Sequence, residues 1–127
     1  MKRFLIVDDE PAIGRFVQHV ARECGYDAIV TGEPEAFMDE VASKEPDAIS
    51  LDLAMPSADG IELLRFLATA KCRAGILLIS GFDERVLETA GELGAALGLR
   101  ICGTLTKPVR AADLRSAIQR IGQECTR

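Results

Sequence analysis

The chain has 127 residues, of which 48% are hydrophobic and 28% are charged, and its formal net charge is −5. This length and composition are typical of one globular domain, and they exclude a disordered tail, a collagen-like repeat and a small disulfide scaffold. A small acidic domain is expected to bind nucleic acid poorly by itself, because phosphate contacts need a basic patch. The longest apolar run, residues 75–79, is far too short to cross a membrane, and the first residues do not form a signal peptide. We therefore expect a cytoplasmic protein that binds neither membrane nor nucleic acid.

The first half of the chain alternates short apolar runs with helical patterns. Residues 4–7 predict a buried strand, and a stripe of apolar residues from Ile13 to Cys24 predicts a helix that starts at Pro11 and ends at Gly25. A second strand is expected at residues 27–31, a second helix at 34–43 and a third strand at 47–53.

The second half continues the alternation. A third helix opens at Asp59 and Gly60, a fourth strand is expected at 75–80, and a fourth helix at 84–97. Its inward stripe is assigned to Val86, Ala90, Leu93 and Leu97. A fifth strand at 100–105 and a helix at 111–121 follow. Strict alternation predicts one α/β domain over residues 1–122, a doubly wound five-stranded parallel sheet with helices on both faces, then a tail or linker at 123–127.

Polar side chains follow four of the five expected strands. They are Asp8, Asp9 and Glu10 after the first strand, Asp52 at the third, Ser80 and Gly81 at the fourth, and Lys107 and Pro108 at the fifth. An open parallel sheet places its functional site at the carboxyl ends of its strands, so these side chains are expected to converge at one edge.

The convergent groups predict phosphoryl chemistry. Clustered carboxylates repel one another unless a cation lies between them, and an oxygen-only ligand set suits Mg²⁺. A carboxylate can act as a nucleophile and form an aspartyl phosphate, for which Asp52 is the central candidate. Mg²⁺ and Lys107 would supply the positive charge that phosphoryl transfer needs.

Four segments carry a family resemblance. In chain order they are Asp8-Asp9-Glu10, residues 52–60 (Asp-Leu-Ala-Met-Pro-Ser-Ala-Asp-Gly), Ile79-Ser80-Gly81 and Thr106-Lys107-Pro108. Together they resemble the receiver (phosphoacceptor) domain of two-component response regulators. The resemblance covers about residues 3–122 and implies a (βα)5 flavodoxin-like fold.

The resemblance implies a role for each matching residue. Asp52 is the expected phosphoacceptor, which takes its phosphoryl group from a phosphohistidine of a sensor kinase or phosphotransfer protein. The expected Mg²⁺ ligands are Asp8, Asp9, Asp52 and the main-chain carbonyl of Ala54. Ser80 is the expected switch hydroxyl and Lys107 the expected phosphate-pairing lysine. The residues expected to shape the surrounding loops are Pro56, Gly60, Gly81 and Pro108.

The resemblance also implies a switch rather than an enzyme with a separate substrate. The domain would catalyse only its own phosphorylation and dephosphorylation. The surface formed by the fourth helix, fifth strand and last helix would then control a partner protein or a fused output domain. The kinase, the signal, the output and the oligomeric state stay open.

The sequence departs from the family at a few positions. Receiver domains usually carry Tyr or Phe three residues before the lysine, where this chain has Thr104. The usual aromatic switch therefore cannot operate. Val109 replaces a frequent Phe, and the stretch between Ser80 and Lys107 is longer than usual. Residues 98–108 are similar to receivers fused to EAL-type cyclic-di-GMP phosphodiesterase domains.

Three other functions share parts of this pattern. A haloacid dehalogenase-type phosphohydrolase also uses Mg²⁺ and an aspartyl phosphate, but it needs a DxD motif after the first strand. A receiver-like scaffold that is never phosphorylated would not need Asp52, Ser80 and Lys107. An FMN-binding flavodoxin would need a Ser/Thr-rich loop where this chain has acids.

Some residues predict structure rather than chemistry. The glycines between Gly91 and Gly98 are expected to allow close packing or to give a looser helix, and His19 is expected to face solvent. The four cysteines form no CxxC pair and have no neighbouring histidine, which argues against a zinc site or redox motif. Reduced thiols are expected without a secretory signal, with Cys24 and Cys102 buried.

Overall fold

The computed structural model describes residues 1–55, 59–81 and 84–123. Strands and helices alternate along the chain as the sequence predicts. The strands are β1 (Arg3–Val7), β2 (Asp27–Thr31), β3 (Ala48–Asp52), β4 (Gly75–Ser80) and β5 (Arg100–Thr106). The helices are α1 (Pro11–Glu23), α2 (Pro34–Ser43), α3 (Gly60–Thr69), α4 (Glu84–Ala96) and α5 (Ala111–Gln123). The last expected helix thus extends to Gln123, and residues 124–127 of the expected tail lie outside the described residues.

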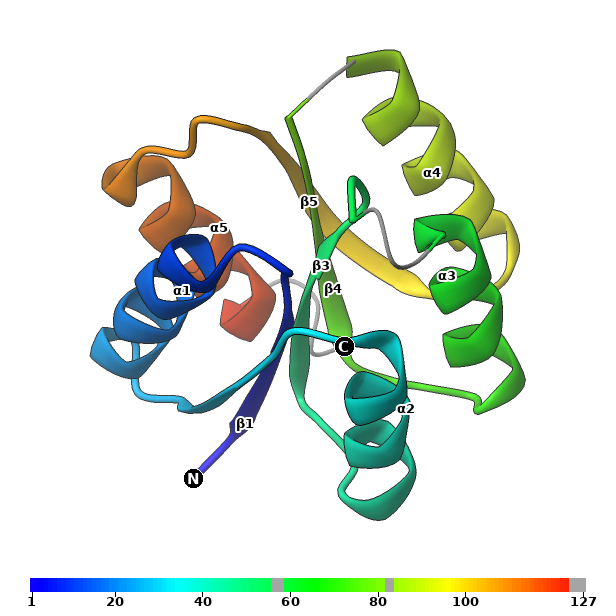
Figure 1. Cartoon of the computed structure of the whole chain (residues 1–127), viewed down its shortest axis with the longest axis horizontal. Coiled ribbons are helices and arrows are strands. Elements are labelled where there is room, and N and C mark those ends of the chain that lie inside the picture. Colours follow the sequence, from blue (N-terminus) through cyan, green and yellow to red (C-terminus); the bar gives the residue numbers. More distant parts are fainter. Residues whose placement is uncertain (56–58, 82–83, 124–127) are drawn as a thin grey trace.

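The strands form one parallel sheet in the order β2-β1-β3-β4-β5. Helices α1 and α5 cover one face, and α2, α3 and α4 cover the other (Figure 1). The expected doubly wound α/β fold is therefore confirmed. All four strand pairs are parallel, so every carboxyl strand end lies at one edge of the sheet and every amino end at the opposite edge.

Two apolar layers hold the helices against the sheet because successive strand residues point to opposite faces. On β1, Phe4 and Ile6 face α1 and α5, whereas Leu5 and Val7 face the other three helices. The central strands β3 and β4 are fully buried along their length, which explains their continuous apolar sequence.

The inward stripe expected for α4 is confirmed at Ala90 but wrong at Val86 and Leu97, and the buried side of the helix lies about one residue away. Leu87, Ala90 and Gly94 are buried, whereas Val86 and Leu97 are exposed. Gly94 decides this orientation, because a Cβ there would lie 2.7 Å from Ile101 Cδ1. The close-packing interpretation is confirmed for Gly94 but not for Gly91, whose added Cβ would meet nothing within 4 Å.

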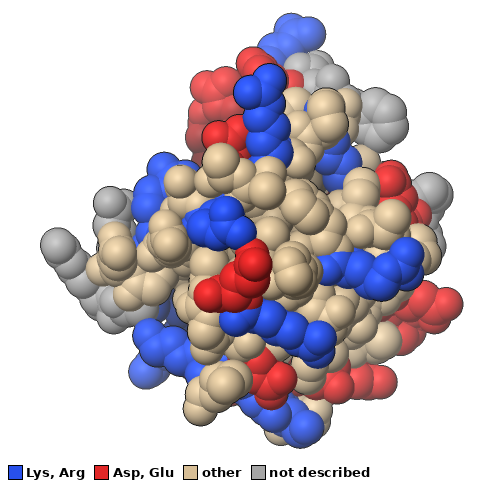
Figure 2. Space-filling view, turned by 90° about the vertical axis from the view of Figure 1, so that its left-hand side faces the viewer, with Lys and Arg blue, Asp and Glu red and all other residues tan. Residues whose placement is uncertain are grey.

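The face formed by α1 and α5 carries more positive charge than the acidic chain as a whole. Figure 2 views this face, where Lys and Arg side chains are spread over an otherwise mostly uncharged surface. An ion pair between Arg115 and Glu23 joins the two helices. His19 is exposed as expected and lies 3.4 Å from Glu23. Within the described residues, no helix is long and apolar enough to cross a membrane.

The cysteines differ in part from expectation. Cys24 and Cys72 are free thiols, as expected, but Cys24 and Cys102 are half-buried rather than buried. Cys102 is disulfide-bonded, so the expectation of reduced thiols is wrong for that residue. The expectation for Cys125 falls outside the described residues.

Candidate functional site

Three carboxylates converge at the carboxyl edge of the sheet. Asp8 and Asp9 follow β1, and Asp52 is the last residue of the adjacent strand β3. One carboxylate oxygen from each of the three lies within 4.8 Å of the others. Asp8 and Asp52 are only 3% and 2% exposed, so two of these acids are removed from bulk water. The sequence expectation that these three residues converge agrees with this geometry.

Backbone hydrogen bonds fix the two buried carboxylates. The Glu10 N–H donates to Asp8 Oδ1 at 2.9 Å, and the Ala54 N–H donates to Asp52 Oδ1 at 2.9 Å. The Asp8 N–H donates to the Thr31 carbonyl, which ties the end of β1 to β2. Both side chains are therefore oriented by the chain immediately after their strands.

Lys107 reaches the cluster from the end of β5. Its Nζ lies 3.2 Å from Asp52 Oδ2, 3.5 Å from Asp8 Oδ2 and 3.7 Å from Glu10 Oε1. Burial alone would lower the pKa of the lysine, but the carboxylates of Asp52, Asp8 and Glu10 outweigh it and raise that pKa. The ammonium group is therefore held in its charged form beside Asp52.

The crowding of carboxylates and the burial shift the pKa of Asp8. Burial raises its pKa to about 6, and the nearby charge of Asp52 adds to the rise. The hydrogen bond from Glu10 and the charge of Lys107 oppose it. One lysine therefore does not compensate the clustered carboxylates fully, and a second cation would be favourable at this edge.

The oxygen donor set fits a hard divalent cation. Three carboxylates on neighbouring chain segments, without nitrogen or sulfur ligands in the cluster, are the chemistry that Mg²⁺ prefers. Ala54 directly follows this cluster and is half-buried, and the role of its carbonyl as a fourth ligand stays a prediction.

The other predicted residues surround the cluster. Ser80 ends β4, is 2% exposed, and accepts a hydrogen bond from the Lys107 N–H on its backbone carbonyl at 2.8 Å. Gly81 is exposed, and an added Cβ would lie 3.6 Å from Lys107 Cβ. The Lys107–Pro108 peptide bond is cis. Pro56 lies outside the described residues.

Gly60 has a clear steric reason to be glycine. An added Cβ would lie 2.6 Å from Leu53 Cδ2 and 3.1 Å from Leu53 Cα. The start of α3 is therefore packed against the residue that follows Asp52. Its neighbour Asp59 caps α3 by accepting a hydrogen bond from the Ile61 N–H.

The structure also places two residues that the sequence singled out, Glu10 and Thr104. Glu10 belongs to the acidic run, where the sequence predicts no separate role for it, and the structure adds it to the partners of Lys107. It is the N-cap residue of α1, yet its side chain makes no capping hydrogen bond, so helix capping does not explain this acid. Thr104 is exposed on β5 and lines a hollow of about 620 Å³ between α4 and β5.

Comparisons with known proteins match one domain family over nearly the whole chain. A family model described as the response regulator receiver domain matches residues 4–119. The chain is 31% identical to the alkaline phosphatase synthesis transcriptional regulatory protein PhoP of Bacillus subtilis, over 94% of this chain and 48% of that protein. It is 25% identical to sporulation initiation phosphotransferase F of the same organism, over 94% and 92% of the two chains.

A solved structure has a similar sequence and fold. A response regulator from Colwellia psychrerythraea is 34% identical and superposes with a TM-score of 0.82, covering 93% of this chain and 94% of that one. The chain spans about half or less of the length of the first curated relatives, from 20% to 48%. The activities of those longer proteins therefore do not transfer directly.

Proposed function

We propose that this chain, which belongs to the family of response regulator receiver domains, accepts a phosphoryl group on Asp52. The donor is a phosphohistidine of a sensor kinase or phosphotransfer protein. One observation carries the choice of Asp52. It is the carboxylate nearest to Lys107, it lies 2% exposed at the end of a central strand, and it belongs to the three-acid cluster.

The transfer needs one nucleophile and several charge-neutralising groups. A carboxylate oxygen of Asp52 attacks the phosphorus, the P–N bond to histidine breaks, and its electron pair stays on the imidazole. The Lys107 ammonium neutralises charge on the phosphoryl oxygens. Asp8, Asp9, Asp52 and the Ala54 carbonyl would hold Mg²⁺, which supplies further neutralisation when bound.

The domain acts as a switch in this proposal. It catalyses only its own phosphorylation and the return reaction with water, and it has no separate substrate. Ser80 ends β4 and Lys107 directly follows β5, and the backbones of the two residues are hydrogen-bonded. A new charge on Asp52 that draws these residues inward would bias α4 and β5 between two arrangements.

A threonine in place of an aromatic residue at position 104 shapes this switch. The hollow between α4 and β5 is lined by Leu87, Gly91, Ile101, Thr104 and Thr106 among others. It leaves space in which α4 can shift without an aromatic ring turning inward. We expect a phosphoryl mimic to move the amide resonances of α4 and β5 in wild type and not in Asp52→Asn. Unchanged resonances in wild type would contradict the switch.

Intact mass spectrometry tests the phosphorylation itself. Wild type and Asp52→Asn are incubated with a small phosphodonor, with and without Mg²⁺. Wild type should gain one phosphoryl group only with Mg²⁺, and the variant should gain none. If wild type gains none from either a small donor or a kinase, the domain is a receiver-like scaffold that binds partners without modification.

The output domain and the location of the protein are also part of what we propose. Residues 98–108 resemble receivers fused to EAL-type phosphodiesterase domains, so we propose an output of this kind and a cytoplasmic location. Sequencing the gene downstream of the codon for Arg127 tests the fusion. An EAL domain in the same reading frame supports it, and a stop codon or another domain contradicts it.

A further inference from the structure

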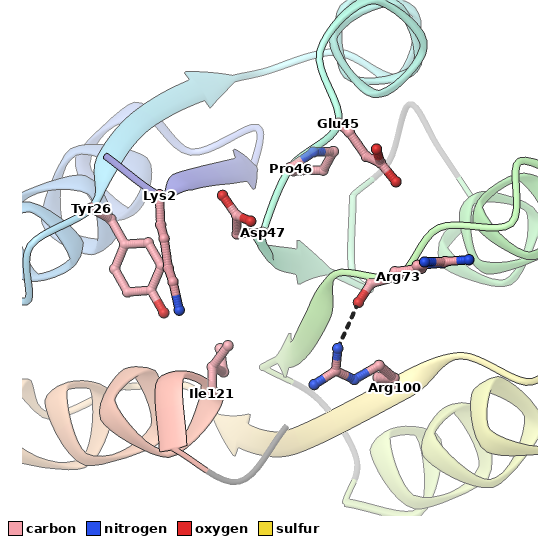
Figure 3. A pocket seen from close by; sticks show the side chains of 8 residues that line it. All are labelled: Lys2, Tyr26, Glu45, Pro46, Asp47, Arg73, Arg100 and Ile121. Carbon is pink, nitrogen blue, oxygen red and sulfur yellow. Dashed lines mark hydrogen bonds between the residues drawn. The ribbon is translucent and has the colours of Figure 1, made fainter. Parts of the chain in front are cut away.

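A second hollow, of about 340 Å³, lies at the amino edge of the sheet, opposite the carboxylate cluster (Figure 3). Every strand contributes a lining residue at or just before its start: Lys2, Tyr26, Asp47, Arg73 and Arg100. Glu45, Pro46 and Ile121 complete the lining. Open parallel sheets usually bind ligands at the carboxyl edge, so this hollow is separate from the site described above.

Tyr26 supplies a hydrogen-bond donor to this hollow. Its side chain is buried, with the residue only 8% exposed, and its ring packs edge-on against Phe4 with the centroids 5.3 Å apart. Its hydroxyl points into the hollow and has no hydrogen-bond partner among the described residues (Figure 3). Burial, with the charge of Asp47, raises the pKa of Tyr26, so the hydroxyl remains a donor. The acceptor for this donor must therefore be water or a ligand inside the hollow.

Two cations approach the same space. Figure 3 shows Lys2 beside Tyr26 on one side and Arg100 entering from β5, with Ile121 near both. Neither Lys2 nor Arg100 forms an ion pair within the described part of the chain, although the chain has more acids than bases. Arg100 Nη1 donates to the Arg73 carbonyl at 3.1 Å, which orients its guanidinium.

Four backbone N–H groups near the hollow are already paired within the protein. The N–H of Arg3 donates to Asp47 Oδ2, and the N–H groups of Asp27, Asp47 and Gly75 donate to backbone carbonyls. An anion in the hollow would therefore be held by side chains. Asp47 Oδ2 already accepts a hydrogen bond from the Arg3 N–H. The protein itself therefore partly offsets the negative charge of this carboxylate.

We propose that this hollow binds a small phosphate monoester, with the phosphate held by Lys2, Arg100 and the Tyr26 hydroxyl. Two cations match a group that carries between one and two negative charges at neutral pH, and an arginine fork suits its oxygens. The volume is that of a small-molecule site and exceeds what an inorganic phosphate fills. The organic part would lie over Pro46 and Ile121, where Glu45 and Asp47 can accept hydrogen bonds from its hydroxyls.

Titration followed by amide resonances of the full chain, without Mg²⁺, tests this site. The probes are ribose 5-phosphate, inorganic phosphate, inorganic sulfate and unphosphorylated ribose. Ribose 5-phosphate should move the resonances of Lys2, Tyr26 and Arg100 and bind more tightly than the three other probes. Asp52→Asn should bind it unchanged, which separates this site from the phosphorylation site.

Matched variants localise the binding. Arg100→Gln and Lys2→Gln should each weaken binding about tenfold or more, because each removes a charged donor. Tyr26→Phe keeps the ring contact with Phe4 and should weaken binding several-fold. Arg65→Gln, an equal charge change on α3, should not weaken it. The proposal is overturned if ribose 5-phosphate moves none of these resonances, if inorganic phosphate or sulfate binds equally tightly, or if Arg100→Gln and Arg65→Gln behave alike.

Discussion

The two edges of one sheet differ in charge in this protein, because the amino-edge hollow is lined by Lys2, Arg73 and Arg100 as well as by Glu45 and Asp47. At the carboxyl edge, Asp8, Asp9 and Asp52 outnumber the single lysine among them, and two of these acids are buried. At the amino edge, Lys2 and Arg100 face a hollow and lack acidic partners among the described residues. Parallel topology alone explains why residues far apart in sequence meet at each edge. The residue types then decide the chemistry, cation binding with phosphoryl transfer at one edge and anion binding at the other.

Removing the lysine at the carboxyl edge should have the largest effect on stability. Without Mg²⁺, Lys107→Met should lower the free energy of unfolding by about 3 kcal/mol, because it leaves buried carboxylates uncompensated. Lys44→Met, at the exposed end of α2, should change it by less than about 0.5 kcal/mol. Denaturant unfolding of both variants measures this. Equal stabilities would show that Lys107 does not balance the acids.

The pH dependence of stability should also distinguish the edges. The pKa of Asp8 is raised to about 6, so between about pH 4 and 6 the folded protein holds a proton that the unfolded chain releases. The free energy of unfolding should therefore fall as pH rises through this window, by about 2–3 kcal/mol without Mg²⁺.

Urea unfolding from pH 4 to 7.5 measures this change. Asp8→Asn should remove most of the fall, whereas the exposed Asp39→Asn should retain it. Mg²⁺ should stabilise wild type more at pH 7.5 than at pH 5, because a deprotonated Asp8 is the better ligand. A fall of equal size in Asp8→Asn would assign it to other groups.

Glycine substitutions should show that the carboxyl edge is the more tightly packed. Gly60→Ala should destabilise the fold by about 1–3 kcal/mol, because its Cβ would lie 3.1 Å from the Leu53 backbone. At the amino edge, an added Cβ at Gly122 would meet Tyr26 at an ordinary 3.6 Å. Gly122→Ala should therefore change stability by less than about 1 kcal/mol. Thermal unfolding compares the stabilities of the two variants. A larger loss of stability in Gly122→Ala than in Gly60→Ala would contradict tighter packing at the carboxyl edge.

The smallest effect is expected from a substitution between the edges. Thr104→Tyr places an aromatic ring at an exposed position that faces the hollow between α4 and β5. It should change stability by about 0.5 kcal/mol or less. It should also leave both phosphorylation and ribose 5-phosphate binding unchanged. A change in both, measured by mass spectrometry and by titration, would show that β5 couples the two edges.

The sequence predicts the site at the carboxyl edge but does not predict the hollow at the amino edge, and the reason is physical. Acids and a lysine that directly follow strands are unusual enough to predict a site, and strict alternation brings them together. Two of the residues at the hollow, Lys2 and Tyr26, directly precede strands, and Arg100 begins one. A single cation or tyrosine at the start of a strand is common, so the sequence does not indicate a site there. Only the folded structure shows that Tyr26, whose ring packs against Phe4, directs its hydroxyl into a hollow.

The misassigned face of α4 has a similar cause. Val86, Leu93 and Leu97 continue an apolar period through Ala90 as well as Leu87 does, so the pattern alone cannot choose between two neighbouring stripes that share Ala90. The choice rests on Gly94, which lets Ile101 approach the helix.

Locating the phosphoryl group directly tests the central claim about the carboxyl edge. After phosphorylation with a small donor and Mg²⁺, borohydride reduces an aspartyl phosphate to homoserine, and peptide mass spectrometry places the converted residue. We expect homoserine at position 52 alone, and none in Asp52→Asn. Homoserine at position 8 or 9, or none in a chain whose mass has gained a phosphoryl group, would contradict it.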